Sequence, residues 1–315
     1  MSQPTTTPRW TRIVPPLVLA LVALAAMATA LAKGSLLSIR YDWKYFESMG
    51  EISRRSVLWY HQAPLWNPYS CGGEVGLANP QSLDAAPTFL LVLLFGVGLG
   101  YKLGLLLYHF VALDGMYRLS RRFGLSIEGA LLAALGFGLS GYFALHFSQG
   151  HVTFIGATLY PYLLLCYDRA VDEIEWAIPT GLVAAWILSL GGTFTPPMAA
   201  ELLLVWATVR AVERRSARPF ALLAIAAVVA FACLAVRLLP VLQFIHDHPR
   251  PPFMRATDRL WPHELVQALV YWRALAPVAG HQYWSHEYTA RLPLRLPGVS
   301  IVPCPENSVS RMLLQ

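Results

Sequence analysis

Seven apolar runs, each close to membrane-spanning length, constrain this sequence more than any other feature. An α-helix needs about 20 mostly apolar residues to cross the hydrocarbon core of a bilayer. Only 13% of the 315 residues are charged, whereas soluble domains carry about 25%. The sequence therefore predicts an all-α polytopic membrane protein with about seven transmembrane helices. The runs are 13–32, 101–118, 126–146, 153–170, 176–192, 197–213 and 219–241.

The arginines predict how these helices are oriented. An eighth apolar run, 87–99, is too short for an ordinary span and is either a short crossing or a helix lying in the membrane interface. If it does not cross, the arginine clusters that end the other runs all fall on one side. The positive-inside rule makes that side cytoplasmic, with the N-terminus there too. The clusters are Arg9 and Arg12, then Arg118, Arg121 and Arg122, then Arg169, and finally Arg210, Arg214, Arg215 and Arg218.

The first run, the net charge and the cysteines limit what kind of protein this is. The run 13–32 is longer than a typical signal-peptide core, which predicts an uncleaved first span, with cleavage near residues 28–30 as the alternative. The net charge of +6 comes mainly from arginines at the ends of apolar runs, so no nucleic-acid partner is expected. The cysteines have no metal-ligand spacing, so no metal site is predicted, although a divalent metal cofactor is compatible with the sequence.

A polar first loop, 34–100, contains most of the motif-like sequence and is predicted to lie on the outer face. Its many tryptophans and tyrosines argue against disorder, so we interpret it as a folded cap on the membrane surface. The predicted organisation is a transmembrane bundle over 1–243 that includes this loop, then an outer segment over 244–290. From 291 to 315 neither helical nor strand periodicity is present, which predicts an irregular, truncated tail.

Asp42 is the candidate catalytic residue. It lies shortly after the first span, between Tyr41 and Trp43, where a carboxylate partly shielded by aromatic rings can act as a general base or a metal ligand. The structural alternative is an interfacial acid that pairs with Lys44 or Arg40.

Further candidates lie in the other outer segments. Arg237, near the outer end of the last run, suits a lipid phosphate, with Arg250 beside it; the alternative is an arginine that snorkels to headgroups. His151 follows His146 across an outer turn and is a candidate for positioning a substrate, although helix capping would equally explain it. Candidate sugar contacts in the first loop are Gln81 and Asn67, which also suit turns.

Several of these motifs together resemble the bacterial YfhO-like membrane proteins. The sequence PLWNPY at 64–69 and the sequence ANPQS at 78–82 are the most specific part of the resemblance. LSGY at 139–142, GH at 150–151, LGG at 190–192 and HEY at 286–288 also fit. That family resembles the GT-C glycosyltransferases, in which an acid of the first outer loop is the proposed base. Asp42 occupies the corresponding position, although many GT-C enzymes carry two adjacent acids there.

The resemblance implies an integral glycosyltransferase (a hexosyltransferase) of GT-C type in the bacterial inner membrane. Its partners would be a polyprenyl-phosphate-linked sugar, a glycan, lipid or protein acceptor, and membrane lipids. Asp42 would deprotonate the acceptor, Arg237 and Arg250 would hold the lipid phosphate, and His151 with Gln81 would position the sugar or acceptor. The alternatives are a transporter or flippase of lipid-linked sugars, whose polar groups would lie near the midplane, and a catalytically inactive membrane scaffold.

Overall fold

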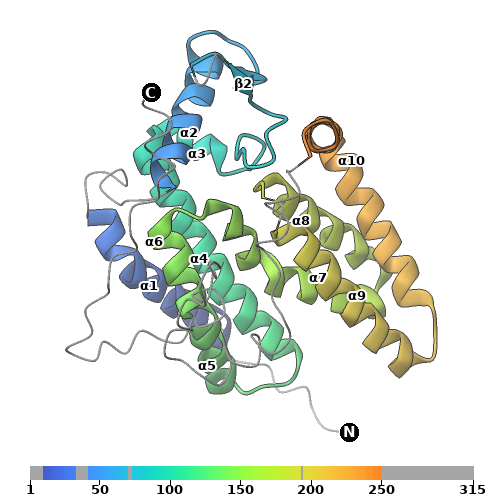
Figure 1. The fold of residues 1–315 in the computed structure, drawn as a ribbon. Coiled ribbons are helices and arrows are strands. Elements are labelled where there is room, and N and C mark those ends of the chain that lie inside the picture. The colour runs from blue at the N-terminus through green and yellow to red at the C-terminus, as the bar shows by residue number, and fades with distance from the viewer. Residues whose placement is uncertain (1–9, 33–41, 70–72, 193, 250–315) are drawn as a thin grey trace, which may run out of the picture.

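The computed structural model describes residues 10–32, 42–69, 73–192 and 194–249, which fold into a helical bundle with a small cap at one end (Figure 1). Within these residues the only strands form one two-stranded antiparallel hairpin, in which Trp66 pairs with Val75. Predictions that concern Arg250, the rest of the segment to 290 and the tail 291–315 fall outside the described residues.

The helices of the first part are α1 (Trp10–Ala32), α2 (Trp43–Leu58), α3 (Phe89–Phe95), α4 (Val97–Arg122), α5 (Ile127–Gly138) and α6 (Gly141–Gln149), with strands β1 (Trp66–Asn67) and β2 (Glu74–Val75). Then follow η2 (Val152–Leu159), α7 (Tyr160–Asp172), η3 (Ile174–Trp176), α8 (Ala177–Ser189), α9 (Thr195–Arg214) and α10 (Arg218–Asp247).

Three helical segments of the described chain are long and apolar enough to cross a membrane. They are 13–32 in α1, 127–149 across α5 and α6, and 218–247 in α10. All three coincide with predicted apolar runs, and they indicate a membrane-embedded protein. The remaining predicted runs fall on α4, on η2 with α7, on α8 and on α9.

Three of the predicted runs are not single α-helices. The run 126–146 is divided between α5 and α6, because the chain turns at Leu139 and Ser140. The run 153–170 begins as the 3-10 helix η2, and α7 starts only at Tyr160, directly before a proline that favours a first helical turn. The short run 87–99 is divided at Gly96, whose φ of 79° ends α3 and allows α4 to begin at once.

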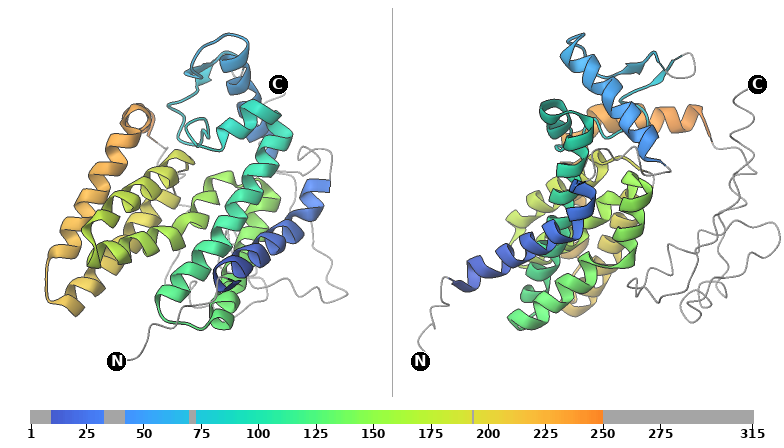
Figure 2. Two further views of the ribbon diagram at one scale, coloured as in Figure 1. Left: turned by 180° about the vertical axis from the view of Figure 1, so that it is seen from behind. Right: turned by 90° about the vertical axis from the view of Figure 1, so that its left-hand side faces the viewer.

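Helix α4 is the centre of the bundle, and it packs against α1, α3, α5, α7 and η2 (Figures 1 and 2). A second group forms where α8 packs on α10 and α7. The buried side chains between the two groups are mostly apolar, and buried phenols form hydrogen bonds between elements. For example, the Tyr108 hydroxyl lies 2.9 Å from Oγ1 of Thr88, and the Tyr167 hydroxyl donates to the carbonyl of Pro219 at 2.7 Å.

One end of the bundle contains the α4–α5 and α9–α10 turns and is held by ion pairs (Figure 1). We call this the arginine end: residues 114–122, 162–176 and 206–218. Asp168 on α7 is almost fully buried there, and it pairs with Arg122 of α4 at 2.8 Å and with Arg210 of α9. Asp172 pairs with Arg214 at 2.6 Å and with Arg122. Three helices are therefore joined by charges that neutralise one another.

The opposite end carries the cap, residues 42–69 and 73–95, which consists of α2, the hairpin, a loop and α3 (Figure 2). The described part of the predicted polar loop is thus folded. Asparagine side chains stabilise its turns, since Oδ1 of Asn67 accepts from the amide of Tyr69 and Oδ1 of Asn79 from that of Gln81, both at 2.9 Å. The cap is fixed to the bundle where the Tyr101 hydroxyl of α4 donates to the Phe46 carbonyl at 3.0 Å.

Candidate functional site

Asp42 is held against the end of α6 by its own backbone and by its neighbour. Its amide donates to the carbonyl of Gln149 at 3.2 Å. Trp43, which is fully buried, donates from Nε1 to the carbonyl of Phe147 at 2.9 Å. Gly150 makes this close approach possible, because it has a φ of 79° and a Cβ there would lie 2.5 Å from the amide nitrogen of Trp43. The first residue before α2 is therefore placed firmly beside the turn after α6.

The Asp42 carboxylate faces a pair of buried histidines. Its Oδ2 lies 3.8 Å from Nε2 of His151, and Nδ1 of His151 lies 3.0 Å from Nδ1 of His146. The Asp42 side chain is 58% exposed, whereas His151 and His146 are 8% and 1% exposed. We call these three residues the Asp42–His151–His146 chain. It runs from solvent into the protein interior, with Asp42 as its accessible end.

The geometry favours one arrangement of protons in this chain. Burial lowers the pKa of His151, against the opposing effect of the Asp42 charge, so its neutral form is favoured. A neutral imidazole carries one N–H, and an N–H at Nε2 faces a carboxylate more favourably than a lone pair does. If His151 is protonated at Nε2, its Nδ1 accepts from Nδ1–H of His146. The Asp42 carboxyl group then faces an N–H rather than a lone pair.

Aromatic rings enclose the inner end of the chain. The imidazole of His146 stacks on Phe154 with ring centroids 4.1 Å apart, and Phe154 stacks on Phe194 at 5.1 Å. Tyr142 meets the edge of His146 at 4.4 Å. These contacts fix the ring orientation of His146 and, through it, that of His151.

Arg237 belongs to a second buried polar group, which ties the cap to α8 and α10. The guanidinium is 4% exposed and donates to the carbonyls of Ser189, at the end of α8, and Ser82, in the cap loop. Nearby, Asp84 accepts from Ser53 of α2 at 2.8 Å. Burial raises the pKa of Asp84, whereas hydrogen bonds from serines and the charge of Arg237 act in the opposite direction. Arg237 is therefore used by the protein's own backbone rather than held free for snorkelling.

The Gly191–Gly192 turn lies between the two polar groups. The amide of Gly192 donates to the carbonyl of Pro80 at 2.7 Å, while a Cβ on Gly192 would lie 2.8 Å from Thr153, two residues after His151. Beside this turn is a pocket of about 190 Å³, lined by Pro80, both glycines and Arg237. The arrangement brings a pocket at the cap end, with Arg237 in its wall, close to the turn that contains His151.

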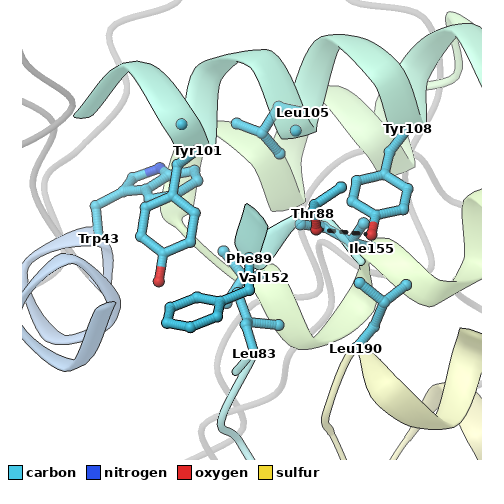
Figure 3. Close-up of a pocket in the computed structure, with 12 residues that line it drawn as sticks. Trp43, Leu83, Thr88, Phe89, Tyr101, Leu105, Tyr108, Val152, Ile155 and Leu190 are labelled. Atoms are coloured by element: carbon cyan, nitrogen blue, oxygen red, sulfur yellow. Dashed lines mark hydrogen bonds between the residues drawn. The ribbon is translucent and has the colours of Figure 1, made fainter. Parts of the chain in front are cut away.

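A smaller cavity behind Asp42 is part of the packing. Figure 3 shows it between α4, η2 and the cap, with Trp43 and Tyr101 at one side and the Thr88–Tyr108 hydrogen bond at the other. Its volume of about 20 Å³ accommodates about one water molecule. This cavity is too small for a substrate.

The structure therefore brings some of the predicted residues together and separates others. Asp42 and His151 are neighbours, and Gln81, which is exposed, lies in the loop that Arg237 holds. Asn67 is almost fully buried in the hairpin, where its side chain serves a turn. His146 is a further residue of the candidate site, and the spacing of the two histidines around Gly150 is the sequence signal for it. Among the described residues no group of three or more His, Cys, Asp or Glu could hold a metal ion.

Comparison of the chain with known proteins gives no relative. No protein-family model, no curated protein and no solved structure matches the sequence or the fold.

Proposed function

We propose that the protein transfers a glycosyl group from a polyprenyl-phosphate donor to an acceptor hydroxyl at the outer face of the membrane. The observation that carries this proposal is the exposed Asp42 carboxylate facing the buried His151–His146 pair. A positioned carboxylate that is open to solvent can accept a proton from an incoming hydroxyl. The resemblance to the YfhO-like proteins supplies the class of donor.

The reaction requires one proton transfer and one bond exchange. Asp42 takes the proton of the acceptor hydroxyl while the hydroxyl oxygen bonds to C1 of the donor sugar. The bond between C1 and the phosphate oxygen breaks, and the polyprenyl phosphate leaves with the electron pair. His151 is a positioning residue in this scheme, because its imidazole lies 3.8 Å from the carboxylate and would orient it. A cation near the phosphate would stabilise the charge that develops there.

Arg237 is the cation that we assign to the donor phosphate, in the 190 Å³ pocket beside the glycine turn. Two of its N–H groups already hold backbone carbonyls, so its role is double. It keeps the 80–82 loop on the glycine turn, and it adds a fixed positive charge to the pocket wall. Gln81, exposed in the same loop, would contact the sugar or the acceptor.

For the membrane topology, we propose that all seven predicted runs cross a bacterial inner membrane with the N-terminus in the cytoplasm, as in GT-C enzymes. The chain reverses between the arginine end and the cap end, and the paired arginines gather at the former (Figure 1). In a cysteine-free background, Ser148→Cys should react with a membrane-impermeant thiol reagent in intact cells, whereas Ser216→Cys should not. Both positions are exposed. Labelling of Ser216→Cys alone would show that the topology is the inverse of the proposed one.

The test of the function is the lipid that accumulates when the protein is absent. Membrane lipids from cells with and without the gene are compared by mass spectrometry. We expect a polyprenyl-phosphate sugar to accumulate in the deletion strain, and to disappear when the wild-type gene is restored. An unchanged pool of lipid-linked sugars would contradict the proposal.

A further inference from the structure

A second pocket, larger than the one beside Arg237, lies on the cap between α2 and the start of α4. Its volume is about 530 Å³, and its wall includes Glu47, Glu51 and Arg55 of α2, Tyr69 after β1, and Val97 and Gly98 of α4. None of these residues belongs to the Asp42–His151–His146 chain or to the Arg237 group.

Glu47 is the residue of this pocket that most needs an explanation. It is only 6% exposed, yet its Oε1 has no hydrogen-bond partner among the described residues. Burial raises its pKa, with the charge of Lys102 acting in the opposite direction. A buried carboxyl oxygen without a partner is costly, and a bound hydrogen-bond donor removes that cost.

The wall of the pocket also contains positive groups. Arg55 uses its Nε to bond Oε1 of Glu51 at 2.8 Å, so the two opposite charges lie side by side in the wall. Helix α4 begins at Val97, and the amides of a first helical turn attract anions. A Cβ added at Gly98 would meet nothing within 4 Å, so a ligand can approach the backbone there. The pocket therefore offers acids for a cation and, beside them, donors for an anion.

Exposed apolar side chains adjoin the pocket at the elbow between α3 and α4. Leu94 is 73% exposed, Phe95 52% and Leu99 49%, and they flank the two α4 residues of the pocket wall in sequence. In a membrane-embedded protein such side chains contact acyl chains. A ligand in this pocket would therefore have a polar part with both charges next to an apolar part.

We propose that this pocket binds the headgroup of an amine-bearing phospholipid, with its ammonium facing Glu47 and Glu51 and its phosphate facing Arg55 and the first turn of α4. The acyl chains would lie on Leu94, Phe95 and Leu99. The inference does not depend on the sugar-transfer proposal, because it uses other residues and requires only that the cap end meets a membrane surface.

The experiment compares two lipids that differ only at the amine. Delipidated full-length protein in detergent is given an equimolar mixture of phosphatidylethanolamine and phosphatidylcholine with identical acyl chains. The retained lipids are measured by native mass spectrometry. We expect phosphatidylethanolamine to be preferred, because its ammonium N–H groups can donate hydrogen bonds to the carboxylates. The choline headgroup has methyl groups in their place and cannot donate. Loss of one charged hydrogen bond corresponds to roughly tenfold in affinity.

Variants decide whether the acids are responsible. Glu47→Gln should reduce the preference about tenfold, and Glu51→Gln should reduce it as well. Glu213→Gln, which changes an exposed acid at the arginine end, is the matched control and should keep the wild-type preference. If Glu47→Gln does not fold, the more exposed Glu51→Gln gives the answer. Equal retention of the two lipids by the wild type, or an unchanged preference in the folded glutamine variants, would overturn the inference.

Discussion

The two ends of the bundle use charged side chains in different ways. At the arginine end the buried Asp168 is shared by Arg122 and Arg210, so acid and base neutralise each other across three helices. At the cap end Asp42 is exposed and faces an imidazole whose neutral form is favoured, while the buried Arg237 donates to two backbone carbonyls. Mutual pairing is suited to holding helices together, whereas an exposed acid beside a positioned imidazole is suited to chemistry.

The largest expected effect is on turnover when Asp42 is replaced. Asp42→Asn keeps the size of the side chain but removes its ability to accept a proton, so transfer should fall by about 10²–10⁴-fold. Stability should hardly change, because the side chain is 58% exposed. The rate is measured with the lipid-linked sugar that accumulates in the deletion strain. A folded variant with near wild-type turnover would remove Asp42 from the mechanism.

At the arginine end the same kind of substitution should act on stability. Asp168→Asn removes the 2% exposed carboxylate that Arg122 and Arg210 share, and leaves them only their more exposed partners Asp172 and Glu213. Removing one member of a buried ion-pair network costs about 3 kcal/mol or more. Thermal unfolding in detergent should therefore begin at a clearly lower temperature. A melting temperature equal to that of the wild type would show that the network contributes little.

Arg237→Gln should have an effect of intermediate size, because Arg237 contributes both to stability and to the binding pocket. Its loss leaves the carbonyls of Ser189 and Ser82 short of donors, which costs about 1–3 kcal/mol in a buried site. It also removes the positive wall of the adjacent pocket, so binding of the lipid-phosphate donor should weaken. Arg237→Lys, which keeps the charge but not the two-carbonyl geometry, separates the two effects. If donor binding is unchanged in both variants, Arg237 acts only in packing.

The smallest effect concerns pH. Since burial lowers the pKa of His151 below its ordinary 6.5, the folded protein binds this proton less readily than the unfolded chain does. The contribution of His151 to stability is therefore complete above about pH 6.5 and is lost as the pH falls below that value. His151→Gln should flatten the change of melting temperature between pH 7 and pH 5. An equally steep profile in the variant would assign that pH dependence to other groups.

Parts of the fold could be read from the sequence, and parts could not. The runs 13–32 and 219–241 coincide with long helices, because their apolar residues are uninterrupted and polar residues bound them. The interruption at Leu139 and Ser140 was not predicted, since the apolar composition continues through it. The seven crossings remain a prediction: the described chain has three helical segments that meet the length and composition of a span.

The sequence predicted residues of the candidate site, but it did not predict the contacts between them. Asp42 and His151 were each identified by their place in outer segments, and the structure brings them to 3.8 Å. The contact between His146 and His151 depends on the left-handed turn at Gly150, which directs the two imidazoles toward each other. Arg237 was predicted to meet a ligand, and its contacts with the Ser82 and Ser189 carbonyls depend on long-range packing that sequence patterns do not reveal.

The central claim is that the cap end carries out the reaction while the arginine end stabilises the fold, and one assay on two variants tests it most directly. Transfer per folded molecule and melting temperature are measured on the same preparations of Asp42→Asn and Asp168→Asn. We expect Asp42→Asn to melt like the wild type and to lose at least about a hundredfold in transfer. Asp168→Asn should melt earlier, and its folded fraction should transfer at the wild-type rate. Wild-type transfer by Asp42→Asn, or loss of transfer without loss of stability in Asp168→Asn, would contradict the claim.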